Sequence, residues 1–302
     1  MSATKTKKPR MLFTAFLRKY GRILIGGTIL AVVLFFTLGA DFLDMGYDPQ
    51  YFDASRINAN VKPDSYDPSG DYHLMGTDQY GRDIWARILH GGKPTLLVAV
   101  GAQTVLVILG TVVGLICGYY NKVERIVMRF LEAFSKIPNL LLTMLVLSLF
   151  TFSKDKSLLE NAWPMMMSMA LHGVPGLARM IRNQVLSLRE KEYIESEKAM
   201  GASDARTIFV HIMPACYSYL LVRFSNGLAG MILSMASLSF LGLGLPSTIP
   251  TWGFMVNESQ EIIFSMDHFY IFMWPTLIIS ITVFGFAMLG DGLRDLLDPR
   301  LK

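Results

Sequence analysis

Long stretches without a charged residue constrain this chain more than any other feature. The 302-residue sequence contains charge-free, largely apolar runs at residues 23–40, 94–120, 137–153, 161–178, 224–257 and 269–290. Crossing ~30 Å of hydrocarbon takes about 20 apolar residues in a helix. Lipid forces backbone polar groups to be satisfied internally, and these runs are too long and too uniformly apolar for barrel strands. The sequence therefore predicts an all-α membrane protein with six transmembrane helices.

Composition and the breaks within the runs refine this prediction. Hydrophobic residues make up 52% of the chain and charged residues 17%, against about 25% charged residues in an ordinary soluble domain. The fifth run extends backward to residue 214, interrupted only by Arg223, and glycines and prolines break it after residue 241. We therefore expect helices over about residues 23–40, 94–120, 137–153, 161–182, 214–241 and 269–290.

Lys and Arg are distributed unevenly along the chain. If both termini lie on one side of the membrane, the segments on that side hold 20 of the 28 Lys and Arg residues, and the opposite segments hold seven. Loops rich in Lys and Arg stay in the cytoplasm, so we expect cytoplasmic termini. The net charge of +4 is then explained by cytoplasmic segments that lie near anionic lipid, and it does not indicate binding to nucleic acid.

This topology divides the chain into three parts. Residues 1–93 are expected to hold a cytoplasmic tail, the first transmembrane helix and an extracytoplasmic loop. Residues 94–291 form the transmembrane domain, and residues 292–302 a cytoplasmic tail. Two neighbouring segments have an amphipathic pattern: residues 81–90, expected at the membrane interface before Pro94 opens the second helix, and residues 291–302, expected as a short tail helix that ends at Pro299.

The segment between the fourth and fifth helices has the pattern of two short helices outside the lipid. The first is expected over about residues 190–200, ending at Gly201, a residue type that helices favour there. Ser203 or Asp204 is expected to cap the second, over residues 205–213. Each helix has an apolar side that needs cover. Another protein can supply it, and so can the chain's own helix ends or the lipid headgroups.

The same segment carries Glu195, then Gly201 six residues later, then Pro214. In type and spacing these residues resemble the EAA loop of binding-protein-dependent ABC-transporter permeases. The motif of that loop is Glu-Ala-Ala, three residues, Gly, nine residues, Ile, one residue and Leu-Pro. A histidine in place of the Ile resembles the peptide-permease branch. The chain departs from the motif at Ser196, Glu197, His211 and Met213.

Three further stretches are similar to motifs of one branch of this family. They are residues 76–83 followed by Ala86, Arg87 and Gly91, residues 237–244 followed by Thr251-Trp252-Gly253, and residues 289–301. Together they resemble the C subunits of dipeptide and oligopeptide permeases over residues 73–302. The resemblance implies a type I ABC-importer transmembrane domain, with a five-helix core and an additional N-terminal helix.

The resemblance also implies how the loop works. In the family, its first helix docks into a groove on a cytoplasmic ATPase subunit, whose motion rocks the membrane helices. The implied partners are a homologous second permease chain, two ATPase subunits that bind ATP and Mg, and an extracytoplasmic substrate-binding protein. The residues of the expected ATPase-coupling loop are Tyr193, Glu195, Ser196, Glu197, Ala199, Met200, Gly201, Ala202, Asp204, His211 and Pro214.

The chain has no motif for covalent chemistry of its own. It contains no Gly-x-x-x-x-Gly-Lys-Ser/Thr phosphate loop and no Ser-centred nucleophile elbow. It also lacks His-Glu-x-x-His and Cys-x-x-Cys, and its five His are scattered. We therefore expect no catalytic residue, no metal site and no bound cofactor in this chain, with ATP hydrolysis carried out by partner chains.

Polar residues inside the predicted membrane helices are candidates for a translocation path, because such residues usually face protein or water. The alternatives are that Arg223 reaches the inner membrane interface, and that the uncharged groups form hydrogen bonds between helices. The candidates are Arg223, Asn226, Gln103 and His172.

The predicted outside loop 244–268 contains no Lys or Arg. In the family, loops on this side receive the substrate-loaded binding protein, and Trp252 and Gly253 are candidates for that contact. The alternative for Trp252 is an aromatic anchor at the membrane interface.

These features predict a permease subunit of an ATP-driven importer of di- or oligopeptides in the bacterial cytoplasmic (inner) membrane. Import of nickel or a metal chelate is the nearest alternative, because importers of this family share the same motifs. A secondary transporter would need its own ion-coupling site, and the predicted helices contain few acidic residues. A scaffolding subunit would need neither a cavity nor a docking helix.

Overall fold

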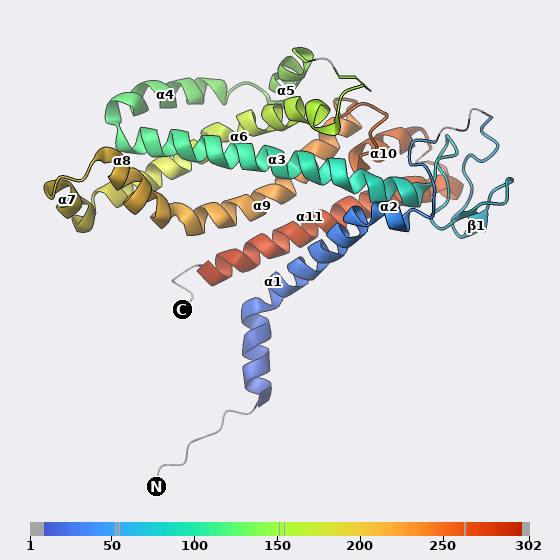
Figure 1. Ribbon diagram of the computed structural model, residues 1–302, viewed down its shortest axis with the longest axis horizontal. Coiled ribbons are helices and arrows are strands. Elements are labelled where there is room, and N and C mark those ends of the chain that lie inside the picture. The colour runs from blue at the N-terminus through green and yellow to red at the C-terminus, as the bar shows by residue number, and fades with distance from the viewer. Residues whose placement is uncertain are drawn as a thin grey trace, which may run out of the picture.

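The chain folds into an elongated bundle of helices with a small cap at one end (Figure 1). The computed structural model describes residues 9–51, 53, 55–150, 152–153, 155–262 and 264–297, and for residues 9–19 the backbone alone. The long helices of this part of the chain are α1 (Pro9–Leu38), α3 (Ile84–Tyr119), α6 (Leu158–Arg189), α9 (Met213–Phe240) and α11 (Phe269–Leu297). The predicted all-α architecture is confirmed.

Shorter elements connect the long helices. α2 (Ala40–Leu43) follows α1, and α4 (Asn121–Phe134) and α5 (Asn139–Ser148) join α3 to α6. α7 (Glu192–Ala199), α8 (Asp204–Arg206) and the π-helical turn η1 (Thr207–Ile212) join α6 to α9. α10 (Trp252–Glu258) and the 3-10 turns η2 (Ser259–Glu261) and η3 (Met266–His268) lead to α11. Strands β1 (Ser65–Tyr66) and β2 (Tyr72–His73) pair antiparallel, with Ser65 opposite His73.

The two ends of the bundle differ in character. α7 and α8 project from one end, which we call the loop end, and the C-terminal part of α11 points the same way (Figure 1). The strands and α10 lie at the opposite end, which we call the cap end. α4 and α5, which join α3 to α6, run back from the loop end (Figure 1), so that α3, α6 and α11 all end toward the loop end.

Four helical stretches of the described chain are long and apolar enough to cross a membrane: residues 20–38, 84–119, 204–240 and 266–297. α4 and α5 add a fifth candidate if this pair, bent by 94°, is one span. α6 has 32 residues, or about 48 Å of helix, but is not among the sufficiently apolar stretches. The predicted number of six helices is matched only roughly.

The structure corrects the predicted third helix, residues 137–153. α5 has only 10 residues, or about 15 Å of helix, which is half of the ~30 Å hydrocarbon layer. Pro138 explains the break, because it has an extended backbone at the start of α5 and has no N–H to continue the helix from α4.

Two predicted amphipathic helices are also corrected. α3 begins at Ile84 and continues through Pro94, so that residues 81–90 do not form a separate helix. Asp83 caps α3 by accepting a hydrogen bond from the Ala86 N–H (2.8 Å), and the first turn is buried rather than interfacial. At the other end, α11 continues unbroken to Leu297, while Pro299 lies outside the described residues.

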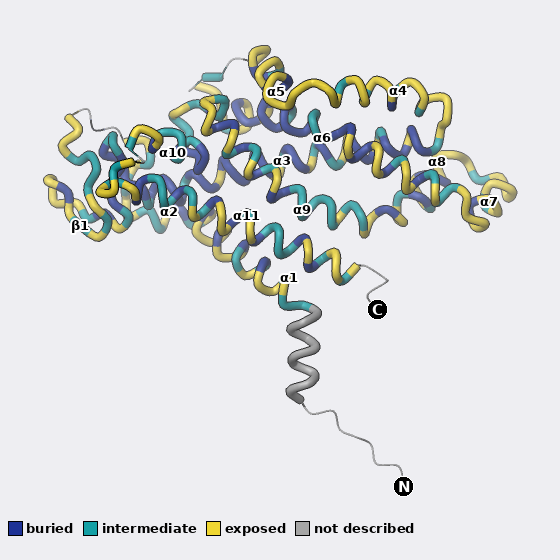
Figure 2. The backbone as a smooth tube through the Cα atoms, turned by 180° about the vertical axis from the view of Figure 1, so that it is seen from behind, coloured by how far each residue is buried: buried dark blue, intermediate teal, exposed yellow. Residues whose placement is uncertain are grey.

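α3 and α6 run side by side in the same direction and pack more closely than any other helix pair of the described chain. Glycines spaced four residues apart on α3 permit this approach, as small residues do between membrane helices. A Cβ on these glycines would lie 2.8, 2.6 and 2.5 Å from side-chain atoms of α6, for the pairs Gly110–Leu177, Gly114–Ile181 and Gly118–Val185. Buried residues accordingly follow α3 and α6 along the bundle (Figure 2).

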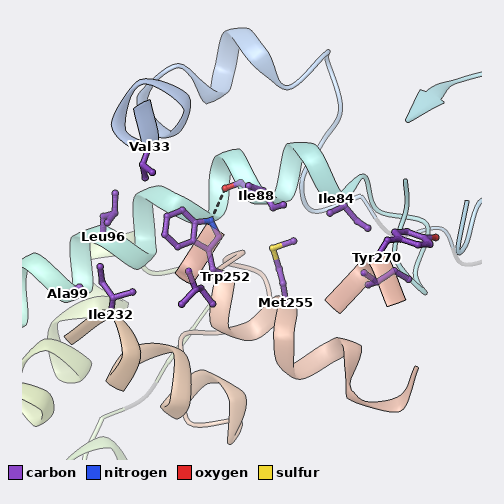
Figure 3. Close-up of a cluster of buried hydrophobic side chains, with 11 residues drawn as sticks. Val33, Ile84, Ile88, Leu96, Ala99, Ile232, Trp252, Met255 and Tyr270 are labelled. Carbon is purple, nitrogen blue, oxygen red and sulfur yellow. Dashed lines mark hydrogen bonds between the residues drawn. The ribbon is translucent and has the colours of Figure 1, made fainter. Parts of the chain in front are cut away.

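At the cap end the core surrounds Trp252 of α10 (Figure 3). Its side chain is 1% exposed, and its indole N–H donates to the Ile88 carbonyl of α3 (2.9 Å). Gly92 of α3 makes room for the ring, because a Cβ there would lie 2.9 Å from it. These contacts fix α10 on the first turns of α3.

Candidate functional site

At the loop end, most residues of α7 are exposed to solvent, and only the side of the helix that carries Ile194 packs against the bundle. Ile194 is fully buried and anchors α7 in the core that continues from α3 and α6. Tyr193 and Met200 are 48% and 75% exposed, and the other exposed residues of α7 are Glu192, Glu195, Ser196, Lys198 and Ala199. Apolar side chains gathered on an exposed helix are typical of a surface that another protein covers.

Gly201 ends α7, as the sequence predicts. Its N–H donates to the Lys198 carbonyl (3.0 Å), and the Ala202 N–H donates to the Glu197 carbonyl (3.1 Å), which is the Schellman arrangement at a helix end. Its φ is +86°, in the left-handed region that favours glycine. Gly201 therefore makes a sharp joint between α7 and α8.

The second predicted helix, residues 205–213, is three continuous elements. Ser203 caps α8 by accepting a hydrogen bond from the Arg206 N–H (3.3 Å). The π-helical turn η1 follows and passes without a break into α9, whose first turn contains Pro214. Ile208 is buried, whereas the neighbouring Phe209 is 59% exposed. The loop is thus joined rigidly to α9.

Asp204 ties the loop to the end of α3. Its two carboxylate oxygens accept hydrogen bonds from the hydroxyls of Tyr119 (2.7 Å) and Tyr120 (3.2 Å). Lys198 of α7 lies over the Tyr119 ring, 4.8 Å from its centroid. The sequence analysis missed both tyrosines, because no sequence pattern connects residues 85 positions apart.

Two arginines of α6 extend these ties. Arg189 donates to the Gly118 carbonyl (3.3 Å) and to the side chain of Asn121 (2.7 Å), where α3 meets α4. Arg182 forms an ion pair with Glu124 of α4. The chain that enters α7 is therefore fastened to α3, α4 and α6 together.

Glu197 and His211 face each other across the joint. His211 Nε2 lies 3.5 Å from Glu197 Oε2, so that the two form an ion pair when the histidine is protonated. Both are positions at which this chain departs from the EAA motif, with Glu for Ala and His for Ile. The two departures contact each other and link α7 to η1.

All four translocation-path candidates line one cavity of about 470 Å³ beside α9: Gln103, His172, Arg223 and Asn226. Gln103 is 1% exposed, and its amide donates to the Arg223 carbonyl (3.2 Å). A second cavity of about 440 Å³ lies toward the loop end, shares Arg223 and Asn226, and adds Arg294 of α11. The polar groups chosen from three separate helices are thus brought together.

The expected contact surface at Trp252 and Gly253 is corrected. Trp252 is enclosed by α3, and a Cβ on Gly253 would lie 2.7 Å from Ala236 of α9. Their burial contradicts both a contact with a binding protein in this conformation and an interfacial role for Trp252. An exposed aromatic anchor and a core tryptophan have the same appearance in an apolar sequence.

Four buried charges at the cap end were missed by the sequence analysis. Arg82 pairs with Asp78 (2.7 Å) and Glu258 (2.8 Å), and Arg87 pairs with the same two carboxylates. All four side chains are at most 14% exposed. Residues 76–83 were visible as a motif, but Glu258 lies 171 positions beyond Arg87. The cluster fastens the start of α3 to α10.

His73 is buried at the cap end between Asp83 and Asp67, whose nearest oxygens lie 2.7 and 3.5 Å from its ring nitrogens. Burial alone lowers the pKa of His73, but the hydrogen bond and charge of Asp83, joined by Asp67, outweigh it and raise the pKa above 6.5.

Among the described side chains, no group of three or more His, Cys, Asp or Glu is placed to hold a metal ion.

Comparison with known proteins gives one consistent result. Residues 110–302 match the family described as "Binding-protein-dependent transport system inner membrane component". The chain is 37% identical to the glutathione transport system permease protein GsiD of Pectobacterium atrosepticum, over 97% of this chain and 91% of the relative. It is 35% identical to the dipeptide transport system permease protein DppC of Alkalihalophilus pseudofirmus (90% and 86% covered) and 32% identical to DppC of Haemophilus influenzae (98% and 96%). The chain therefore belongs to the binding-protein-dependent ABC-transporter permeases of the inner membrane, in their dipeptide and oligopeptide branch.

Proposed function

We propose that this ABC-importer permease carries di- and oligopeptides into the cell, driven by separate ATPase subunits that grip its loop end. The names of the relatives support the substrate class, because they are permeases for dipeptides and for glutathione, which is a tripeptide. The chain itself carries out no covalent step in this proposal. ATP and Mg are bound by the ATPase partners.

The exposed surface of α7 carries the coupling proposal. It presents Tyr193 and Met200 to solvent, while Ile194 beneath them is locked into the core of the bundle. The Schellman joint at Gly201 and the ties of Asp204 to α3 hold this surface in a fixed orientation. A helix that is exposed to a partner on one side and fastened to α3, α4 and α6 on the other is suited to transmit motion.

The proposed orientation places the loop end in the cytoplasm. The excess of Lys and Arg in the segments of this side supports it. A substrate-binding protein would then approach the cap end, and a homologous permease chain would complete the translocation path. At the cap end, a polar cavity of about 460 Å³ lined by Gln79, Asn257 and Glu261 is accessible in place of the buried Trp252.

Photo-crosslinking tests the coupling partner. Tyr193 is replaced by benzoylphenylalanine in the tagged full-length chain, cells with the native complex are irradiated, and adducts are identified by mass spectrometry. We expect an adduct with a subunit that hydrolyses nucleotide. The same replacement at Leu145 of α5, which is 61% exposed, is the control and should give no such adduct. Adducts of residue 193 with lipid alone would refute the assignment.

Transport by the reconstituted complex tests the substrate class. Proteoliposomes with the binding protein should take up a labelled dipeptide only with ATP, and uptake should persist with an uncoupler. Uptake without ATP, or uptake of a metal chelate in preference to peptides, would contradict the proposal.

A further inference from the structure

The two cavities beside α9 share one positively charged residue. Arg223 lines both, and Arg294 of α11 joins it in the cavity nearer the loop end. The amide of Asn226 also lines both cavities, the hydroxyl of Tyr219 lines the cavity nearer the loop end, and the imidazole of His172 lines the other. The described residues that line these cavities include no Asp or Glu.

Neither guanidinium is neutralised within the described part of the chain. Arg223 and Arg294 form no ion pair there, in contrast to Arg22, Arg82, Arg87 and Arg182, which pair with carboxylates. The Nε of Arg223 is shielded from solvent and has no hydrogen-bond partner. A charge inside a membrane helix usually has a partner or faces a pathway, and Arg223 fits the second case because it lines both cavities.

The guanidinium group selects which anion fits. Its planar fork matches a carboxylate in a bidentate manner, with charge-assisted hydrogen bonds. The identity of the anion rests on the proposed transport of peptides. Every peptide with a free C-terminus has a terminal carboxylate, whatever its side chains are. We propose that Arg223, assisted by Arg294, forms a transient binding site for the terminal carboxylate of the transported peptide.

This site explains how one path accepts many peptides. Recognition of the terminal carboxylate requires no pocket for a particular side chain. The cavity of about 470 Å³ is within the ~300–1,000 Å³ range of small-molecule sites. The positive charges of Arg223 and Arg294 also disfavour a bare metal cation relative to a carboxylate.

A matched pair of substrates tests the proposal in the reconstituted complex. Uptake of dialanine and of its C-terminal amide is measured with the same binding protein for wild type, Arg223→Gln and Arg223→Lys. We expect Arg223→Gln to reduce uptake of the free acid at least about tenfold and to leave the amide within about twofold. The preference of the binding protein cancels in this comparison between variants. Arg223→Lys should retain part of the preference for the acid.

The exposed Arg129 of α4 provides the control. Arg129→Gln removes a positive charge outside both cavities and should leave the ratio of acid to amide uptake unchanged. An equal reduction of acid and amide uptake in Arg223→Gln would overturn the proposal, because the arginine would then act on the protein and not on the carboxylate.

A chemical probe tests the site without transport. Cys117 and Cys216, both buried, are changed to Ala, and Ser218, which lines the cavity nearer the loop end, is changed to Cys. The rates of modification by anionic sulfonatoethyl and cationic trimethylammonioethyl methanethiosulfonate are compared in the assembled complex. We expect the anionic reagent to react faster than the cationic one. Arg223→Gln should lower the ratio of the anionic to the cationic rate by about threefold or more.

The two measurements fail in distinguishable ways. A complex that transports no peptide but keeps the Arg223-dependent reagent ratio refutes the proposed substrate and leaves the anion site standing. A ratio that does not change in Arg223→Gln refutes the anion site. A third outcome combines two results: the ratio of anionic to cationic modification rises when anionic lipids are replaced by phosphatidylcholine, and Arg223→Gln reduces uptake of acid and amide equally. This outcome would assign Arg223 to lipid phosphate and overturn the proposal.

Discussion

Gly201 determines the geometry of the joint between α7 and α8. Its φ of +86° is in the left-handed region, yet no atom lies within 4 Å of a Cβ built there. A side chain at this position therefore meets backbone strain and no steric clash. Substitutions at residue 201 therefore test the effect of the backbone conformation without the effect of a steric clash.

We predict that Gly201→Val inserts into the membrane normally but loses the ATP hydrolysis stimulated by loaded binding protein. The β-branched side chain disfavours positive φ, so that α7 is turned away from its partner. Gly201→Asn is the matched control, because Asn tolerates this conformation, and it should retain most of the stimulation. Stimulation at the wild-type level in Gly201→Val would show that the joint is not needed.

Arg87 gives a second prediction for a single residue. Arg87→Met leaves Asp78 and Glu258 buried with Arg82 as their remaining partner, and removing one partner of a buried pair costs roughly 3 kcal/mol. We expect a clearly lower Tm of the purified complex. Arg129→Met, an exposed position, should change stability by less than about 0.5 kcal/mol. Equal Tm values for the two variants would refute the importance of the cluster.

The α3–α6 pair is the element that holds the loop end in place. Gly114 faces Ile181 and the Ala178 carbonyl so closely that a Cβ would lie 2.6 and 2.8 Å from them. Because backbone and a branched side chain meet there, neither can move aside without separating the helices.

We therefore predict that Gly114→Ala destabilises the protein by about 1–3 kcal/mol, as overpacking does. Gly176→Ala on α6 is the matched control, since no atom lies within 4 Å of a Cβ there, and it should leave Tm unchanged or slightly raised. The measurement is thermal unfolding of the full complex in detergent. A Tm of Gly114→Ala equal to that of Gly176→Ala would contradict the close packing.

The long helices were predictable because both lipid and the protein core demand apolar residues, so that charge-free runs indicate them. The start of α3 was missed for the opposite reason. Arg82 and Arg87 make the segment appear soluble, but their charges are neutralised by Glu258, far away in the sequence. Pro138 accounts for the break between α4 and α5, but the angle of 94° depends on packing.

The candidate sites were predictable in part. Intramembrane polarity was sufficient to select Gln103, His172 and Arg223, but their gathering in one cavity depends on how α6 packs against α3. The tie between Asp204 and Tyr119 is likewise a product of tertiary structure. Trp252 was misassigned because hydropathy does not distinguish a residue covered by lipid from one covered by protein.

At the scale of the whole molecule, the cap is stabilised by a charge that depends on pH. Asp83 and Asp67 raise the pKa of the buried His73 above 6.5. A raised pKa means that the folded state binds the proton more tightly than the unfolded state. The stabilisation is therefore fully present below pH 6.5 and is lost as pH rises through the pKa of the folded protein.

We predict that Tm of the wild-type complex falls between pH 6.5 and pH 9 more steeply than Tm of His73→Gln. Glutamine retains a hydrogen-bonding side chain but has no proton to lose in this range. The measurement is thermal unfolding of both proteins at matched ionic strength. Identical pH dependence in the two proteins would show that His73 is not protonated in the folded state.

The glycines of α3 have a mechanical consequence. Gly110, Gly114 and Gly118 each leave a gap in the surface of α3 that is filled by a branched side chain of α6, and these gaps repeat every four residues. The two helices cannot slip past each other gradually, because the next matching alignment is a full step of about 6 Å away. Under the proposed coupling, a force on α7 is therefore expected to tilt α3 and α6 together as one rigid unit and not to slide one along the other.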